Sequence, residues 1–248
     1  MTMIKLKIDG KEVQAKKGTT ILEAARDAMI PIPSLCYRKD LNKAGVCRVC
    51  VVEVKGMPGL QPSCKTPVRE GMQVITDSDE IRASRKRSLE LLFNEHRSYC
   101  DLCDSDGRCE LQSLCKMYKV DESKVRRKSR IVQEVLDDNP FLEYRSDQCI
   151  KCLRCVKTCE IACGRSAITA KKNGLRSIIA APFGPDWESS LCESCGNCAQ
   201  ACPTGAIQVK KRKNYRNKEI KRTITTCPHC ATGWQLELLV KDGLVVDV

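Results

Sequence analysis

The stretch CIKCLRCVKTC at residues 149–159 and its counterpart CESCGNCAQAC at residues 192–202 carry the strongest signal in this sequence. Both read C-x2-C-x2-C-x3-C, and the second run begins 43 positions after the first. In such a run three thiolates surround one 4Fe-4S cubane, whereas the fourth binds the cubane of the other run. The repeat therefore predicts a domain with two 4Fe-4S sites. Zinc is the weaker alternative, because zinc sites usually use separate cysteine pairs.

The exchange of fourth ligands assigns each thiolate to a site. One predicted set is Cys149, Cys152, Cys155 and Cys202, and the other is Cys192, Cys195, Cys198 and Cys159. The second run is followed by the expected proline, Pro203, whereas Glu160 stands at that place in the first run. The sequence therefore departs from the pattern directly after Cys159, which makes Cys159 the less regular of the two exchanged ligands.

A further cysteine group lies near the N-terminus, with the spacing C-x10-C-x2-C-x13-C. Its members are Cys36, Cys47, Cys50 and Cys64. Four thiolates suit a 2Fe-2S rhombus, with two thiolates on each iron. The spacing alone would leave structural zinc as a fair competitor. Beside the 4Fe-4S repeat, a 2Fe-2S cluster is the preferred interpretation.

Between these groups the sequence reads H-x3-C-x2-C-x5-C. The residues are His96, Cys100, Cys103 and Cys109. A histidine at a helix end is more often a C-terminal cap, but the cysteine spacing favours a ligand. A neutral imidazole in place of a thiolate makes a cluster less negative and raises its potential. We therefore expect this centre to differ in potential from its neighbours.

Four cysteines are left over. Cys115 and Cys163 are interpreted as spare, since an unligated cysteine often packs as a small apolar residue. Cys227 and Cys230 form a lone C-x2-C pair, which supplies half of a tetrahedral site. A vestigial or structural role is favoured for this uncertain, incomplete site.

Composition agrees with an intracellular metalloprotein. The 19 cysteines fall in short runs, and the N-terminus has no apolar signal region. We therefore expect a cytoplasmic location without membrane insertion. The net charge of +12 raises nucleic acid as a partner, but four thiolate-bound clusters would add roughly −7. The basic runs also lack interleaved aromatic residues, so no nucleic-acid partner is expected.

Patterning outside the cysteines predicts an α+β fold built of small domains. Residues 4–8 and 11–15 alternate around Asp9-Gly10 as a hairpin, and Thr20 with Glu23 forms a capping box for a helix that ends at Pro31. A second helix is expected from Asp77 to about His96, and residues 119–148 are expected to form a surface connection. The expected domains are residues 1–78, 79–145, 146–212 and a tail at 213–248.

From Ile4 to about Val209 the order of motifs resembles one known module. It is the N-terminal iron-sulfur module of the large iron-sulfur subunit of NADH:quinone oxidoreductase, iron-only hydrogenases and NAD-dependent formate dehydrogenases. The likeness includes GRCELQSL at residues 107–114 and CESCGNCAQACPTGAI at residues 192–207. It implies a β-grasp 2Fe-2S ferredoxin domain, a helical segment whose 4Fe-4S cluster is bound by one histidine and three cysteines, and a bacterial-type two-4Fe-4S ferredoxin domain. The total is one 2Fe-2S and three 4Fe-4S clusters.

The tail resembles the start of a molybdopterin-enzyme 4Fe-4S domain, but it is truncated. Trp234 stands where the third cysteine of that motif would be. The sequence contains no G-x-G-x-x-G and no Walker motif. FMN or FAD and NAD(P) are therefore expected on partner subunits only.

The resemblance implies an electron-transfer subunit, without a catalytic residue of its own, in a cytoplasmic NAD(P)H-dependent oxidoreductase that could also bifurcate electrons. The type would be a short diaphorase or transhydrogenase subunit. Expected partners are a flavin- and NAD(P)H-binding diaphorase subunit and a small 2Fe-2S subunit on one side. On the other side they are ferredoxin or a hydrogenase or formate dehydrogenase catalytic subunit. The alternative is a freestanding multi-cluster ferredoxin that diffuses as a carrier.

Overall fold

The computed structural model describes residues 2–41, 44–96, 100–121, 135–136, 138–171, 177–183, 187, 190–210, 221–228, 231–241 and 243–247. The chain divides into two compact units, Met1–Val209 and Lys210–Val248, and each is described by itself. Within the part of the chain that is described, no helix is long and apolar enough to cross a membrane.

The first unit begins with a five-stranded mixed sheet in the order β2-β1-β5-β3-β4. Its strands are β1 (Met3–Ile8), β2 (Lys11–Lys16), β3 (Val51–Val54), β4 (Gln61–Pro62) and β5 (Gln73–Ile75). Strands β1 and β5 run parallel, and the other pairs are antiparallel. Asp9 and Gly10 both have positive φ, as a two-residue hairpin turn requires. The predicted N-terminal hairpin is confirmed.

Helix α1 (Ile21–Asp27) packs its apolar residues into the core of this sheet. The predicted capping box is present: the Thr20 hydroxyl accepts from the Glu23 amide, and the Glu23 carboxylate accepts from the Thr20 amide. The helix ends earlier than expected. Met29 adopts a left-handed conformation and is 89% exposed, so it lies outside the helix.

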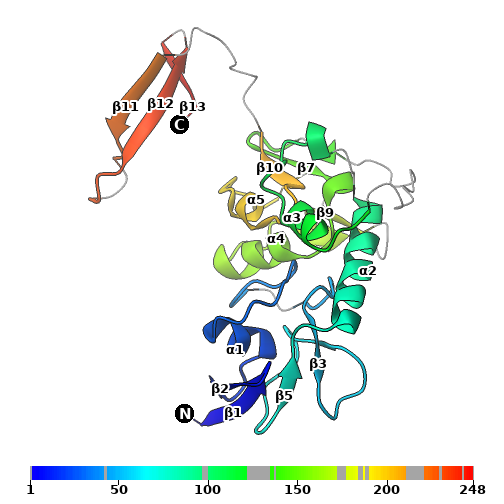
Figure 1. Ribbon diagram of the computed structural model, residues 1–248. Coiled ribbons are helices and arrows are strands. Elements are labelled where there is room, and N and C mark those ends of the chain that lie inside the picture. The colour runs from blue at the N-terminus through cyan, green and yellow to red at the C-terminus, as the bar shows by residue number, and fades with distance from the viewer. Residues whose placement is uncertain are drawn as a thin grey trace. The chain divides into compact units, whose positions relative to one another are not determined.

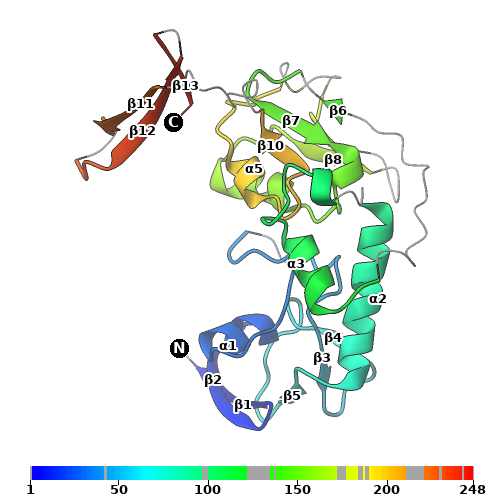
Figure 2. The ribbon, with the colours of Figure 1, turned by 45° about the horizontal axis from the view of Figure 1, so that its top comes forward.

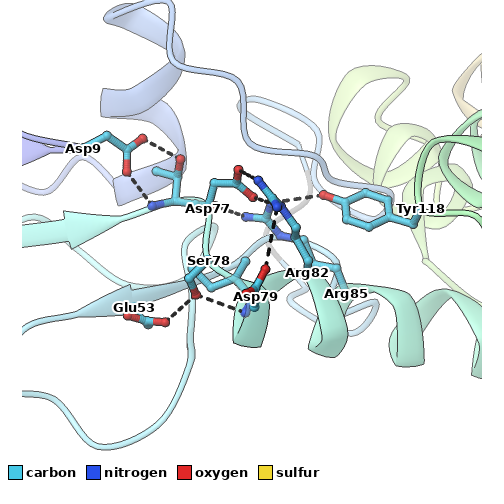
Figure 3. Close-up of polar contacts among 10 residues, drawn as sticks. Asp9, Glu53, Asp77, Ser78, Asp79, Arg82, Arg85 and Tyr118 are labelled. Atoms are coloured by element: carbon cyan, nitrogen blue, oxygen red, sulfur yellow. Dashed lines mark hydrogen bonds and ion pairs between the residues drawn. The ribbon is translucent and has the colours of Figure 1, made fainter.

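Helix α2 (Asp79–Glu95) begins later than expected. Ser78 is its N-cap and accepts from the Ile81 amide, while the Asp77 carboxylate instead accepts from Arg82 (Figure 3). The helix lies against β3 and then against α3 (Glu110–Met117), so it connects the sheet to the next segment (Figure 1). Its buried residues form a stripe that faces the rest of the unit: Ile81, Arg85, Leu89 and Phe93.

The prediction of a surface connection at residues 119–148 is wrong for residues 135–145, which contain two strands of a sheet. Strand β7 (Leu142–Arg145) lies in the middle of a sheet between β10 (Ile207–Val209) and β6 (Val135–Leu136). Leu142 and Tyr144 are fully buried, although the sequence around them is charged. Residues 122–134, which include the basic run of this segment, lie outside the described residues.

The cysteine repeat folds around two short helices, α4 (Arg154–Lys157) and α5 (Asn197–Ala201), beside the hairpin of β8 (Thr169–Lys171) and β9 (Ile178–Ala180) (Figure 2). A π-helical turn, η3 (Thr158–Ala162), extends α4. The two runs share backbone geometry. Positive φ occurs at Lys151 and Ser194, and again at Leu153 and Gly196, which are matching positions of the repeat.

The second unit is an antiparallel sheet of β11 (Lys221–Thr226), β12 (Gln235–Lys241) and β13 (Leu244–Asp247). The Cys227 amide donates to the Trp234 carbonyl at 2.7 Å, which closes the connection between β11 and β12. Cys230 lies outside the described residues. The incomplete site expected at this cysteine pair therefore stays a prediction.

Candidate metal centres

The predicted ligands form four sets, which are named by position from this point on. The N-terminal set is Cys36, Cys47, Cys50 and Cys64; the histidine set is His96, Cys100, Cys103 and Cys109; the central set is Cys149, Cys152, Cys155 and Cys202; the outer set is Cys159, Cys192, Cys195 and Cys198. All eighteen cysteines that the structure describes are outside disulfides. Among the described residues, no three Cys, His, Asp or Glu side chains are grouped as ligands of one metal ion.

The N-terminal set is brought together beside the first sheet, and all four side chains are buried. The Cys47 thiol donates to the Cys36 sulfur, Cys64 lies within hydrogen-bonding reach of it, and these contacts hold the pKa of Cys36 far below the ordinary value. A hydrogen bond from Cys64 likewise lowers the pKa of Cys50 to about 6. The four sulfurs are thus close enough to share protons. This arrangement fits a group that binds thiolates.

The cysteine loop of this set approaches its neighbour closely at Gly45. Gly45 has a φ of +72°, and a Cβ there would lie 2.8 Å from Lys65 Cγ and 4.0 Å from the Cys64 sulfur. Only glycine takes this conformation readily and leaves this space. Directly before Cys64, the Ser63 hydroxyl donates to the Cys50 carbonyl at 2.6 Å and fixes the start of β3.

In the histidine set, His96 is the C-cap of α2 and is buried. Burial lowers its pKa, which favours the neutral imidazole that binds metals. Its Nδ1 atom is buried and has no hydrogen-bond partner in the described part of the chain. A buried ring nitrogen without a partner is costly unless it has a ligand, so this atom fits a metal bond.

The cysteines of the histidine set lie nearby. Gln148 connects these cysteines to the His96 ring, because its backbone is hydrogen-bonded to His96 and its side-chain nitrogen lies 3.9 Å from the Cys103 sulfur. Cys103 and Cys100 belong to one tight turn, in which the Cys103 amide donates to the Cys100 carbonyl at 3.0 Å. Cys109 caps α3, and its sulfur accepts from the Gln112 amide at 3.5 Å.

The central set combines three cysteines of the first run with Cys202 of the second. Burial raises the pKa of Cys149, Cys152 and Cys155, and the Cys202 sulfur contributes to the rise in each. The Lys151 amide donates to the Cys149 sulfur at 3.3 Å, which its left-handed backbone makes possible. Cys202 therefore lies with the first run, as the exchange of fourth ligands predicts.

The outer set shows the reverse exchange. Burial raises the pKa of Cys198 to about 12, and the sulfurs of Cys192, Cys195 and Cys159 add to the effect. A cavity of about 240 Å³ is lined by these four cysteines. N–H groups point at three of these sulfurs: the Ala167 amide donates to Cys159 at 3.3 Å, and the side chains of Asn139 and Asn197 donate to Cys192 and Cys195, each at 3.6 Å.

The two cysteines interpreted as spare lie in different places. Cys115 is buried on α3, as expected for an apolar helix position. Cys163 instead lines the cavity of the outer set, and its sulfur lies 3.9 Å from that of Cys195. The signal in the sequence was its spacing, because residues four apart on a helix share a face and Cys163 follows Cys159 by four.

The sets are joined by apolar packing. One continuous core contains Cys36 and Cys47 of the N-terminal set, Cys109 of the histidine set and Cys152 of the central set. A second core contains cysteines of both runs, either within it or packed against it: Cys149, Cys155, Cys159, Cys198 and Cys202. Three sets thus meet at a single core, and the central and outer sets share the other.

Backbone contacts reinforce the junction between the histidine and central sets. The Glu110 amide, directly after Cys109, donates to the Pro203 carbonyl, directly after Cys202, at 2.8 Å. Gly205 has a φ of +68°, and a Cβ there would overlap the hydroxyl of Ser105. The cysteine loops of the two sets are therefore in van der Waals contact.

Three family descriptions match the chain. Residues 1–79 match the 2Fe-2S iron-sulfur cluster binding domain, residues 85–124 the NADH-ubiquinone oxidoreductase-G iron-sulfur binding region, and residues 185–208 the 4Fe-4S binding domain. The first two segments contain the whole N-terminal set and the whole histidine set, and the third contains Cys192, Cys195 and Cys198 of the outer set together with Cys202 of the central set.

Relatives match over most of the chain. NADPH-Fe(3+) oxidoreductase subunit alpha of Geobacter sulfurreducens (strain DL-1 / KN400) is 37% identical over 99% of this chain and 29% of its own length. NADP-reducing hydrogenase subunit HndD of Solidesulfovibrio fructosivorans is 36% identical over 84% of this chain and 36% of its own length. The NADH-ubiquinone oxidoreductase 75 kDa subunit of Reclinomonas americana is 33% identical over 99% of this chain and 35% of its own length. The chain thus spans roughly a third of the length of these curated relatives.

A solved structure of an NAD+-reducing [NiFe]-hydrogenase in the H2-reduced state has a chain of similar fold. The TM-score is 0.79 at 28% identity, over 87% of this chain and 91% of that chain. The chain thus carries a 2Fe-2S cluster binding domain and the NADH-ubiquinone oxidoreductase-G iron-sulfur binding region, and it is similar to subunits of NADH-quinone oxidoreductases, hydrogenases and formate dehydrogenases.

Proposed function

We propose that the chain relays single electrons through one 2Fe-2S and three 4Fe-4S clusters. The N-terminal set would hold the 2Fe-2S cluster, and the other three sets would each hold a cubane. A bound cluster supplies a centre that accepts and releases one electron. The chain itself supplies the thiolates, the imidazole, the N–H donors to sulfur and the apolar surroundings, which together set the potential.

The observation that carries this proposal is the core shared by three sets. Cys36, Cys109 and Cys152 come from different segments, yet they pack in one apolar cluster. Electron tunnelling falls steeply with distance, so a relay needs its centres close together with protein between them. Four independent structural sites would not need such packing. The shared core therefore favours transfer between the sites.

The same proposal assigns roles to the N–H groups that point at sulfur. Donors reach Cys149, Cys159 and Cys192 within 3.6 Å. A hydrogen bond to a ligating sulfur stabilises the reduced, more negative cluster and raises its potential. The His96 imidazole acts in the same direction, because it replaces an anionic ligand by a neutral one.

Electrons are proposed to come from a flavin- and NAD(P)H-binding partner subunit. The names of the Geobacter and Solidesulfovibrio relatives refer to NADPH and NADP, and the structural neighbour is an NAD+-reducing hydrogenase. The acceptor is proposed to be ferredoxin or a hydrogenase or formate dehydrogenase subunit. Purification with a flavoprotein under native conditions supports this assignment, whereas recovery as a single free chain favours the diffusing carrier.

The relay is tested by electron paramagnetic resonance (EPR) during a controlled-potential titration of the anaerobically purified protein. Four reducible centres should appear, and the signals of neighbouring reduced centres should broaden or split through spin coupling. Four signals whose shapes do not depend on the reduction of the others would contradict the relay. No reducible centre at all would contradict the cluster assignment itself.

A further inference from the structure

The cavity of the outer set holds one sulfur more than a cubane uses. Its lining contains Cys163 in addition to Cys159, Cys192, Cys195 and Cys198. A 4Fe-4S cluster takes four protein ligands, one for each iron. The extra thiol is therefore part of the site, although the repeat pattern gives it no role.

Cys163 lies beside two of the four predicted ligands. Its sulfur is 3.9 Å from that of Cys195, and the Asn197 side-chain nitrogen reaches both sulfurs, at 3.4 Å and 3.6 Å. The sulfur of Cys159 is also near enough to act on it electrostatically. The thiol thus lies against the part of the cavity at which Cys195 would hold its iron.

The local backbone explains this placement. Residues Thr158–Ala162 form a π-helical turn, and the Cys163 amide donates to the Thr158 carbonyl at 3.1 Å. Such widened turns are rare and often occur at functional sites. Cys163 ends the turn four residues after Cys159, so both side chains face the cavity.

Solvent access distinguishes Cys195 from the other cysteines of the cavity. It is the exposed member, whereas Cys198 is buried and Cys159, Cys163 and Cys192 are intermediate. An exposed thiolate ligand is the one that water and other ligands reach first. A replacement sulfur is therefore most useful at this position.

We propose that Cys163 is a reserve ligand of the outer 4Fe-4S site and replaces Cys195 on its iron. This inference rests on the proposed cluster assignment. In the exchange the iron–sulfur bond to Cys195 breaks and a bond to Cys163 forms, while the Cys163 proton passes to the departing Cys195 thiolate. Ligand count, charge and oxidation state stay the same, so no oxidant or reductant is required.

The test compares iron content in alanine variants of the anaerobically purified chain. Cys195→Ala should keep about 14 iron atoms, as should Cys163→Ala, because each leaves four thiolates at the outer site. The double variant Cys195→Ala/Cys163→Ala should fall to about 13 iron with a three-iron EPR signal, or to about 10 if the whole cubane is lost. The rescue is thus read from the difference between the single and double variants.

The matched control is Cys192→Ala. Cys192 belongs to the same set, but its sulfur accepts from the Asn139 side chain, whereas the sulfur of Cys163 lies beside Cys195. This variant should lose iron as the double variant does. The proposal is overturned if Cys195→Ala loses as much iron as Cys192→Ala, or if the double variant keeps its full content.

A second readout does not depend on the folding of the double variant. Iodoacetamide should alkylate Cys163 in the native holo-protein, and peptide mass analysis should find it protected by iron in Cys195→Ala. Equal labelling of Cys163 in both proteins contradicts the exchange. If the unaltered chain itself lacks iron, the cluster assignment fails, whereas a full iron content with unprotected Cys163 refutes the reserve ligand alone.

Discussion

Arg154 binds Glu110 through two parallel hydrogen bonds, Nη1 to Oε1 at 2.7 Å and Nη2 to Oε2 at 3.0 Å. Arg154 lies between Cys152 and Cys155 of the central set, and Glu110 directly follows Cys109 of the histidine set. A planar guanidinium on a carboxylate fixes orientation as well as distance. The pair therefore sets the geometry between two neighbouring proposed clusters.

Breaking this pair should weaken the packing between the histidine set and the central set. Arg154→Met leaves the half-exposed Glu110 without its partner, and we expect a loss of about 1–3 kcal/mol in the free energy of unfolding, between the surface and buried cases. Urea denaturation followed by circular dichroism measures it. Arg154→Lys keeps the positive charge but cannot make the two parallel hydrogen bonds, so its free energy of unfolding should lie between those of the unaltered protein and Arg154→Met. A Met variant as stable as the unaltered protein would show that the pair has no structural role.

Gly205→Ala should push apart the cysteine loops of the histidine set and the central set, which are in contact at Ser105 and Gly205. The added methyl group meets the buried Ser105 hydroxyl, and the positive φ strains any other residue. We expect a loss of about 1–3 kcal/mol and weaker spin coupling between the two centres. Ser105→Gly combined with Gly205→Ala removes the clash and should restore part of the stability. No rescue by the second change would mean that backbone strain alone causes the effect.

Arg85 connects the first sheet to Tyr118, the residue that caps the C-terminus of α3. Its Nη2 donates to the carbonyls of Val51 and Thr76, at 2.8 Å and 3.0 Å. Its Nη1 donates to the Tyr118 hydroxyl at 3.1 Å (Figure 3). Arg85→Met leaves buried carbonyls without these donors, and we expect a loss of about 2–4 kcal/mol in the free energy of unfolding.

Thermal and urea denaturation measure this loss, with Tyr118→Phe as the control that removes only the hydrogen bond from Arg85 to the Tyr118 hydroxyl. Because Val51 follows Cys50, the 2Fe-2S signal should broaden or disappear in Arg85→Met while the signals of the outer set persist. Equal effects on all signals would point to general unfolding instead.

His96→Cys should keep a cluster but lower its potential, because an anionic thiolate replaces a neutral imidazole. Potentiometric EPR of this variant measures the shift. Cys115→Ser is the companion change on the neighbouring helix and should leave the iron content unchanged. A higher potential in His96→Cys, or loss of iron in Cys115→Ser, would overturn the ligand assignment of the histidine set.

Local patterns in the sequence predicted much of this fold. The hairpin at Asp9-Gly10 and the capping box at Thr20 and Glu23 depend on residues within a few positions, so spacing reveals them. The repeat likewise predicted that Cys202 lies with the first run. Such features need only short-range geometry or a repeated spacing.

Features that depend on distant partners were missed. Asp77 and Ser78 are both acceptable N-caps, and the bond from Arg82 to Asp77 leaves the cap to Ser78. Strand β7 is four residues long among charged neighbours, and pairing with β10 buries it. The spacing of four residues from Cys159 was a signal for the position of Cys163, whereas the π-helical turn that sets this position is seen only in the structure. The four-domain division of the chain stays a prediction.

The central claim is most directly tested by measuring iron, acid-labile sulfide and zinc per chain on anaerobically purified protein. One rhombus and three cubanes predict about 14 iron atoms and as many sulfides, without zinc. Zinc in place of iron would contradict the electron relay.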